Sequence, residues 1–304
     1  MPGVPLAAPT AVRLANGVTL DVWQEGPRKC PPLIFLHGFP ESLRSWRHQI
    51  AHLAGVYRCI APDQRGYGKS SRPANDADYA TPHLVADVFA LADALGLEHF
   101  GVVAHDWGGV IAWEALHADA ARRIRLAIIA NAPHPALFQE RLFTSPAQRA
   151  ASQYIRQFRD PATDEALATE GLAPLLLRLF GKGTFAAMEP TERTALLERW
   201  HEPGAAQAML AWYRASAIRV PAWDAPLCVP DGWQGLPEAR IRVPVLTLWG
   251  EKDANLPADN LVGLNEICTQ LTIRRLPGVG HFAPWEAPAA VNEAIEAFLA
   301  RHRL

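Results

Sequence analysis

The chain has 304 residues, of which 49% are hydrophobic and 20% charged, enough for one large domain or for a domain that carries an insert. Its formal net charge of −2 supplies no basic surface for a polyanion, so nucleic acid is excluded as an expected partner. No run of about 18 apolar residues occurs, and the segment 1–17 lacks the basic start and apolar block of a signal peptide. We therefore expect a cytoplasmic protein with no membrane span.

Short apolar segments alternate with amphipathic ones through the first 130 residues and again near the end. The apolar residues of 82–95 recur at spacings of three and four, which predicts a helix, and further helices are expected at 109–118 and 288–302. The predicted strands are 19–23, 33–36, 58–61, 100–104, 126–130, 244–249 and 271–276. This alternation is typical of an α/β fold in which a mostly parallel sheet is flanked by helices on both faces.

The segment between these two stretches has a different pattern. From 135 to 236 the sequence is helix-like and interrupted by prolines, without a convincing buried strand, and its end at 220–237 carries four prolines and is expected to be a loop. We therefore predict an α/β core made of 1–134 and 237–304, with a helical cap inserted at 135–236.

The stretch VVAHDWGGVIAW at 102–113 combines a strand, a sharp turn and a helix. That order is typical of a nucleophile elbow, in which a serine usually stands with a small residue two positions to either side. Here Asp106 stands between Ala104 and Gly108. The dipole and the free N–H groups of a helix N-terminus favour an ionised carboxylate, so Asp106 needs no base to activate it. Capping of the helix without chemistry is the alternative role.

The ends of three further predicted strands carry residues that suit an enzyme with a nucleophile elbow. His281 follows the last predicted strand and a Gly-x-Gly turn, where a histidine can act as general base. Asp253 follows the preceding strand and is the expected partner of this imidazole, with Glu251 as its competitor. The fold takes one oxyanion N–H from the loop after an early strand and one from the residue after the nucleophile, which are Phe39 and Trp107 here.

A carboxylate nucleophile favours alkyl rather than acyl chemistry, because attack on an sp³ carbon gives an ordinary ester that a histidine and an oxyanion hole can hydrolyse. Epoxides and carbon–halogen compounds are the two substrate classes that fit. An opening epoxide needs a proton donor, and a tyrosine stays protonated at neutral pH. The predicted cap contains two tyrosines, Tyr154 and Tyr213, for which amphipathic packing is the alternative role.

Together the segments HGFPES, PDQRGYGKS, HDWGG, WYR, GEKD and GVGHF resemble the α/β-hydrolase-fold epoxide hydrolases of the soluble type, without a phosphatase domain, over nearly the whole chain. In that family one ring-opening tyrosine lies 48 residues after the nucleophile, where Tyr154 stands, and the other lies in a WYR triplet, which contains Tyr213. The family often has a cis peptide in its HGxP turn, which makes Phe39-Pro40 a candidate. Gln64 departs from the usual Leu or Met of the PDxRGYG loop.

The resemblance implies hydrolysis of an epoxide to a vicinal diol, in detoxification, through a hydroxyalkyl ester on Asp106. His281 and Asp253 would activate the water co-substrate, Tyr154 and Tyr213 would bind and protonate the ring oxygen, and no cofactor or metal is expected. A fluoroacetate dehalogenase would carry arginine where Trp107 stands. A haloalkane dehalogenase fits that tryptophan but leaves the tyrosines without a task. A non-enzymatic ligand receptor is the remaining alternative.

The tryptophans of the cap region, Trp200, Trp212, Trp223 and Trp233, suggest an apolar pocket and an apolar or aromatic epoxide, although packing is the more frequent role of such residues. The sequence leaves monomer and homodimer open.

Overall fold

The computed structural model describes residues 8–180, 185, 188–302 and 304. These residues form an eight-stranded sheet in the order β1-β2-β4-β3-β5-β6-β7-β8, in which β1 and β2 are antiparallel to their neighbours and the other strands are parallel. The strands are β1 Thr10–Arg13, β2 Thr19–Glu25, β3 Pro32–Leu36, β4 Arg58–Asp63, β5 Phe100–His105, β6 Ile124–Ala130, β7 Val245–Gly250 and β8 Leu271–Leu276. The parallel sheet predicted from the sequence is confirmed.

Helices cover both faces of this sheet, which is why its central strands β4, β5 and β7 are buried along their whole length. The helices α2 Thr81–Ala94 and α3 Trp107–Ala118 pack in one apolar cluster, whereas α1 Arg47–Leu53 and α13 Pro288–Leu299 pack in another. Shorter helices are η1 Leu43–Trp46, η2 Asp76–Tyr79, η3 Ala258–Leu261, α11 Leu264–Ile267 and α12 Ala283–Glu286.

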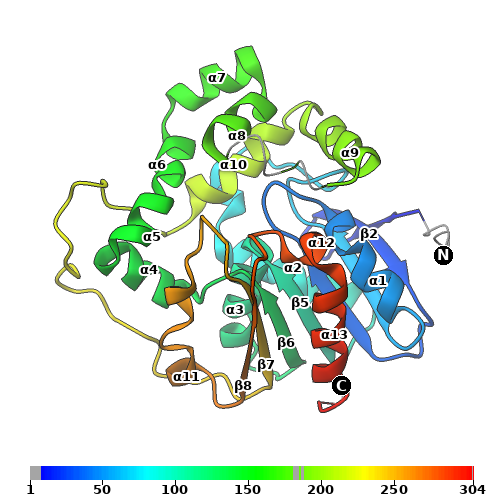
Figure 1. Ribbon diagram of the computed structural model, residues 1–304. Coiled ribbons are helices and arrows are strands. Elements are labelled where there is room, and N and C mark those ends of the chain that lie inside the picture. Colours follow the sequence, from blue (N-terminus) through cyan, green and yellow to red (C-terminus); the bar gives the residue numbers. More distant parts are fainter. Residues whose placement is uncertain (1–7, 181–184, 186–187, 303) are drawn as a thin grey trace.

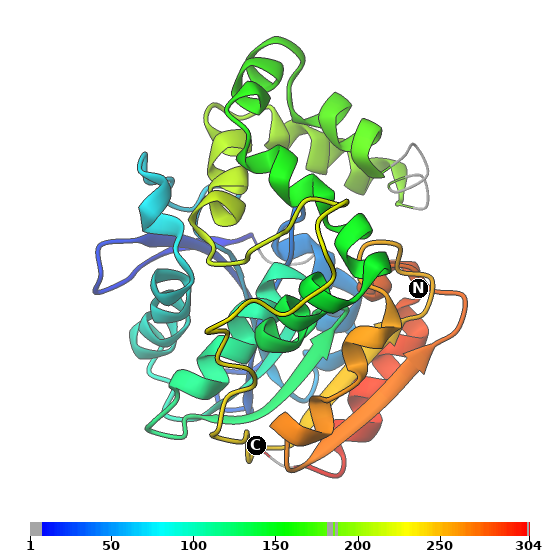
Figure 2. The ribbon, with the colours of Figure 1, turned by 90° about the vertical axis from the view of Figure 1, so that its left-hand side faces the viewer.

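A layer of helices lies above one end of the sheet (Figures 1 and 2). It follows β6 and consists of α4 Pro135–Thr144, α5 Pro146–Ala151, α6 Gln153–Arg159, α7 Ala162–Glu170, α8 Leu172–Phe180, α9 Pro190–Trp200 and α10 Ala205–Ala215. The segment 216–244 then returns to β7 without a helix or strand, held by hydrogen bonds from Gln139, Arg149 and Gln153 to its backbone. Helices therefore occupy the predicted cap only as far as Ala215, while the division of the chain into core and cap stays a prediction.

Two buried tryptophans join the cap helices to the core. The indole N–H of Trp200 donates to the carbonyl of Pro40 at 2.8 Å, and that of Trp212 to the carbonyl of Arg65 at 3.0 Å. Trp223, by contrast, is 75% exposed on the connection 216–244. Trp200 and Trp212 therefore serve packing, which the sequence analysis named as the more frequent role, whereas Trp223 lies in solvent.

The sequence pattern missed several elements, among them β1 and α1. The strand β1 is exposed along most of its four residues, so it leaves no apolar run to detect, and α1 is only seven residues long. Each predicted strand overlaps the observed one, with ends that differ by at most two residues. Among the described residues, no helix has both the length and the apolar character needed to cross a membrane.

Candidate active site

Asp106 lies at the turn between β5 and α3 with φ 50° and ψ −122°, a backbone conformation that is strained for a residue with a side chain. Although it occupies the N-cap position of α3, its side chain makes no capping hydrogen bond with that helix. Its Oδ1 instead accepts a hydrogen bond of 2.7 Å from the backbone N–H of Phe39. The strained turn thus aims the carboxylate away from its own helix, toward the loop after β3.

Glycines allow the loop after β3, the turn after β5 and the first turn of α3 to lie close together. A Cβ at Gly38 would lie 2.4 Å from Cβ of Asp106, and one at Gly108 would lie 2.3 Å from the carbonyl oxygen of Leu36. Both distances are well inside van der Waals contact. The packing of the elbow against β3 and the loop after it therefore requires small residues in HGFP and HDWGG. The Phe39-Pro40 peptide in this loop is cis, as the resemblance implied.

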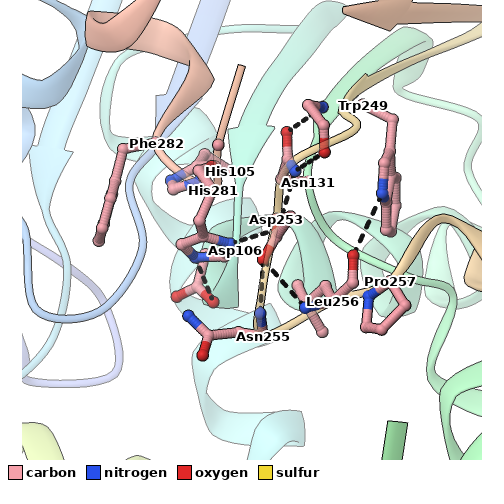
Figure 3. Close-up of polar contacts among 12 residues, drawn as sticks. His105, Asp106, Asn131, Trp249, Asp253, Asn255, Leu256, Pro257, His281 and Phe282 are labelled. Atoms are coloured by element: carbon pink, nitrogen blue, oxygen red, sulfur yellow. Dashed lines mark hydrogen bonds and ion pairs between the residues drawn. The ribbon is translucent and has the colours of Figure 1, made fainter. Parts of the chain in front are cut away.

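His281 lies between two carboxylates (Figure 3). Its Nδ1 is 2.7 Å from Oδ2 of Asp253, and its Nε2 is 3.5 Å from Oδ2 of Asp106. The competitor Glu251 is directed elsewhere, since its carboxylate lies 3.4 Å from Arg275. The structure thus brings together the residues that the sequence proposed as nucleophile, base and orienting acid.

The loop after β7 fixes the orienting carboxylate. Oδ1 of Asp253 accepts hydrogen bonds of 2.9 Å from the backbone N–H groups of both Asn255 and Leu256. Its Oδ2 accepts one of 2.8 Å from the side-chain amide of Asn131, a residue that follows β6 and that the sequence interpretation missed. The carbonyl oxygen of the Asn131 side chain in turn accepts from the N–H of Gly250, so the amide joins the ends of β6 and β7.

Asp106 and His281 shift each other's pKa. Burial alone would raise the pKa of Asp106, but the neighbouring His281 and the N–H of Phe39 outweigh it and hold that pKa below its usual value. Burial alone would lower the pKa of His281, but the carboxylates of Asp253 and Asp106 raise it well above its usual value. In the resting protein the nucleophile is therefore ionised and the imidazole carries a proton.

Both predicted tyrosines point into the same site from the cap. Tyr154 belongs to α6 and Tyr213 to α10, and their ring centroids are 5.9 Å apart. Burial and the nearby charge of Asp106 raise the pKa of both phenols. A side-chain hydrogen bond with Tyr213 opposes the rise of the pKa at Tyr154, and one with Trp107 opposes it at Tyr213. Both phenols therefore stay protonated at neutral pH.

The site opens into a cavity of about 580 Å³ between the cap and α3, which Asp106, Trp107, Tyr154 and Tyr213 line at one end. This volume is typical of sites for small molecules. A separate cavity of about 20 Å³ lies next to Asp106 and His281, and it is large enough for one water molecule. Trp107 is the first residue of α3, so its backbone N–H has no acceptor within that helix. It is the second oxyanion N–H that the sequence predicts, beside that of Phe39, which contacts Asp106.

A buried polar network supports the histidine and was not foreseen from the sequence. The imidazole of His105, beside the nucleophile in sequence, lies 2.8 Å from the carboxylate of Glu41 and 2.9 Å from the carbonyl oxygen of His281. The indole N–H of Trp285 donates to the other carboxylate oxygen of Glu41 at 2.7 Å. Burial alone would raise the pKa of Glu41, but His105 and these hydrogen bonds hold it below its usual value.

Comparisons with known proteins agree with this geometry. A model of the alpha/beta hydrolase fold matches residues 31–288. Epoxide hydrolase 2 of Caenorhabditis elegans is 30% identical over 296 residues, which are 95% of this chain and 79% of that protein. Epoxide hydrolase 4 of Mus musculus is 32% identical over 93% of this chain and 77% of that protein.

Solved structures give the same result. A structure described as one of the novel epoxide hydrolases from metagenomes of hot environments has a TM-score of 0.94 and 52% identity, over 98% of this chain and all of that one. A Bacillus megaterium epoxide hydrolase in complex with an inhibitor has a TM-score of 0.84 and 28% identity, over 96% of this chain and all of that one. By sequence and by structure, the chain belongs to the epoxide hydrolases of the α/β-hydrolase fold.

Proposed function

We propose that this protein hydrolyses epoxides to vicinal diols through a covalent ester on Asp106. One observation carries the proposal: an ionised carboxylate on a nucleophile elbow faces two protonated phenols, Tyr154 and Tyr213, across one cavity. A carboxylate can attack an electrophilic carbon, and a phenol can protonate the alkoxide that leaves. The names of the relatives support the same substrate class.

In the first step, a carboxylate oxygen of Asp106 attacks a ring carbon and the bond from that carbon to the ring oxygen breaks. The electron pair goes to the ring oxygen, which takes a proton from Tyr154 or Tyr213. The N–H of Phe39 already holds Oδ1 of Asp106, so Oδ2 is the attacking atom and Oδ1 becomes the carbonyl oxygen of the ester. The product is a hydroxyalkyl ester that retains the whole substrate.

Ester formation itself prepares the base for the second step. Alkylation removes the charge of Asp106, one of the two carboxylates that raise the pKa of His281, so this pKa falls and the imidazole can release its proton. That proton restores the phenol of the tyrosine that protonated the ring oxygen. The neutral imidazole, oriented by Asp253, takes a proton from a water molecule in the small cavity, and the hydroxide attacks the ester carbonyl carbon. The N–H groups of Phe39 and Trp107 stabilise the oxyanion. On its collapse the bond from the carbonyl carbon to the substrate oxygen breaks, and that oxygen takes the proton of the new carboxyl group of Asp106. This releases the diol and restores the ionised carboxylate and the protonated imidazole.

Specific contacts disfavour the alternatives. The side chain of Trp107 is hydrogen-bonded to Tyr213, whereas a haloalkane dehalogenase would direct that indole N–H at a halide. A haloacetate needs a cation for its carboxylate, yet among the described residues that line the large cavity there is no lysine, arginine or histidine. A receptor has no use for an oriented base and a hydrogen-bonded nucleophile.

Matched substrates test the choice of leaving group. We would assay diol formation from a terminal epoxide and halide release from the haloalkane of the same carbon skeleton, for the wild type and for the double variant Tyr154→Phe, Tyr213→Phe. We expect diol formation that depends on the tyrosines and little halide release. Halide release that survives the double substitution, without diol formation by the wild type, contradicts the proposal.

We further propose a cytoplasmic detoxification enzyme that needs no cofactor or metal and acts on epoxides with apolar or aromatic groups. Apolar side chains supply most of the wall of the large cavity, among them Val85, Val110, Phe138 and Ile155, which supports this substrate class. Sedimentation of the purified protein distinguishes a monomer from a homodimer.

A further inference from the structure

A second carboxylate lines the large cavity, at a distance from the nucleophile. Glu114 lies on α3 and contributes to the cavity wall together with Asp106, Val110 and Ala118. Because helical residues four positions apart share one face, these four form a single stripe along the wall. At a rise of 1.5 Å per residue, the Cα atoms of Glu114 and Asp106 are about 12 Å apart along the helix.

Glu114 lacks a partner among the residues that the structure describes. It makes no hydrogen bond or ion pair with any residue that the structure describes, and its side chain is half-buried. Burial raises its pKa, and no nearby charged group adds to or opposes that shift. The described residues along the cavity include no cationic side chain, so the two carboxylates give this mostly apolar space a negative potential.

A partly desolvated carboxylate without a partner binds hydrogen-bond donors strongly, because the bond is charge-assisted and little water competes for it. We propose that Glu114 is a specificity residue of this enzyme, which binds a hydrogen-bond-donating group, above all a protonated amine, at the end of the substrate remote from the epoxide. This inference rests on the proposed function. The same carboxylate, together with Asp106, repels epoxides whose remote end is itself a carboxylate.

The volume of the cavity is consistent with such a substrate. A reactive epoxide placed against Asp106, Tyr154 and Tyr213 occupies one end, and the rest of the roughly 580 Å³ extends along α3 past Val110 to Glu114. An apolar chain of the substrate therefore lies along the apolar wall of the cavity, and a polar group at the end of that chain reaches the carboxylate of Glu114.

Two series of terminal epoxides with increasing chain length test the proposal, one ending in an amino group and the other in a methyl group. The measured quantity is the ratio of kcat/KM for the amino-ended to the methyl-ended member at each length. For the wild type, we expect the ratio to be highest where the extended chain spans about 12 Å. Glu114→Gln should lower that maximum at least about tenfold, mainly through KM, because a charge-assisted hydrogen bond is lost.

A matched control removes the same charge elsewhere. Glu293 is exposed on α13, outside the cavity, and Glu293→Gln should change the ratio by less than about twofold. A second variant, Glu114→Lys, should instead favour carboxylate-ended epoxides of the same length. It keeps the proposal testable if Glu114→Gln lowers the melting temperature.

The outcomes separate the two proposals. Diol formation with a ratio that neither Glu114 variant changes overturns the role of Glu114 and leaves epoxide hydrolysis intact. Absence of diol from every member of both series overturns the proposed function itself.

Discussion

The side-chain amide of Asn131 donates a hydrogen bond of 2.8 Å to Oδ2 of Asp253, the same oxygen that lies 2.7 Å from Nδ1 of His281. Asn131 is fully buried and has a φ of 41°. This amide therefore sets the position of the acid that orients the base, and we regard it as a positioning residue.

Asn131→Gly removes the amide without straining the backbone, because glycine tolerates positive φ. We expect about a tenfold loss of kcat, with hydrolysis of the ester slowed more than its formation, because the hydrogen bond to Asp253 serves the base and leaves the nucleophile untouched. Single-turnover kinetics separate the two steps. Equal slowing of both steps would show that the amide has only a structural role.

Tyr154 and Tyr213 should both contribute to protonation of the ring oxygen. Tyr154→Phe and Tyr213→Phe should each lower the rate of ester formation by about tenfold to a hundredfold, and the double variant by about 10⁴-fold, because one phenol remains in each single variant. Rapid-quench measurement of the ester gives these rates. A double variant that alkylates as fast as a single one contradicts proton donation by the pair.

Acid should trap the intermediate. Asp106 stays ionised well below neutral pH because its pKa is lowered, whereas the ester form needs a neutral imidazole at His281. Lowering the pH increases the protonated fraction of that imidazole, so hydrolysis slows while alkylation continues, and the fraction of esterified enzyme rises. Intact mass of acid-quenched samples reports this fraction. If the esterified fraction falls as the pH is lowered, protonation of a group other than His281 controls the balance between ester formation and ester hydrolysis.

The buried polar network of Glu41, His105 and Trp285, which lies beside His281, should contribute to the stability of the fold. Glu41 and His105 are both fully buried, so Glu41→Leu leaves the imidazole of His105 without its carboxylate partner and should lower the free energy of unfolding by about 3 kcal/mol. Asp93→Asn breaks a pair with Arg123 at a largely exposed carboxylate and should change the same quantity by less than about 0.5 kcal/mol. Urea denaturation of both variants measures the difference. Equal effects would show that the buried pair adds no more than an exposed one.

The sequence alone predicted the parts of this fold that leave a periodic signal. Buried parallel strands such as β5 and β7 are mostly apolar, and the elbow, the histidine loop and the cap tyrosines follow from motif and chain order. Asn131 was missed because nothing in one sequence tells that its side chain crosses to the loop after β7. Glu41 and His105 were missed for the same reason, since 64 positions separate these two partners. The cavity wall at Glu114 likewise depends on how the cap sits on α3.

The covalent ester is the central claim, and the mass of one variant tests it most directly. His281→Gln removes the base but keeps the nucleophile, so an epoxide that the wild type turns over should add its whole mass to this variant, and the modified peptide should contain Asp106. The double variant Asp106→Asn, His281→Gln should gain no mass. If His281→Gln remains unmodified in the presence of an epoxide that the wild type converts to diol, the ester mechanism is wrong.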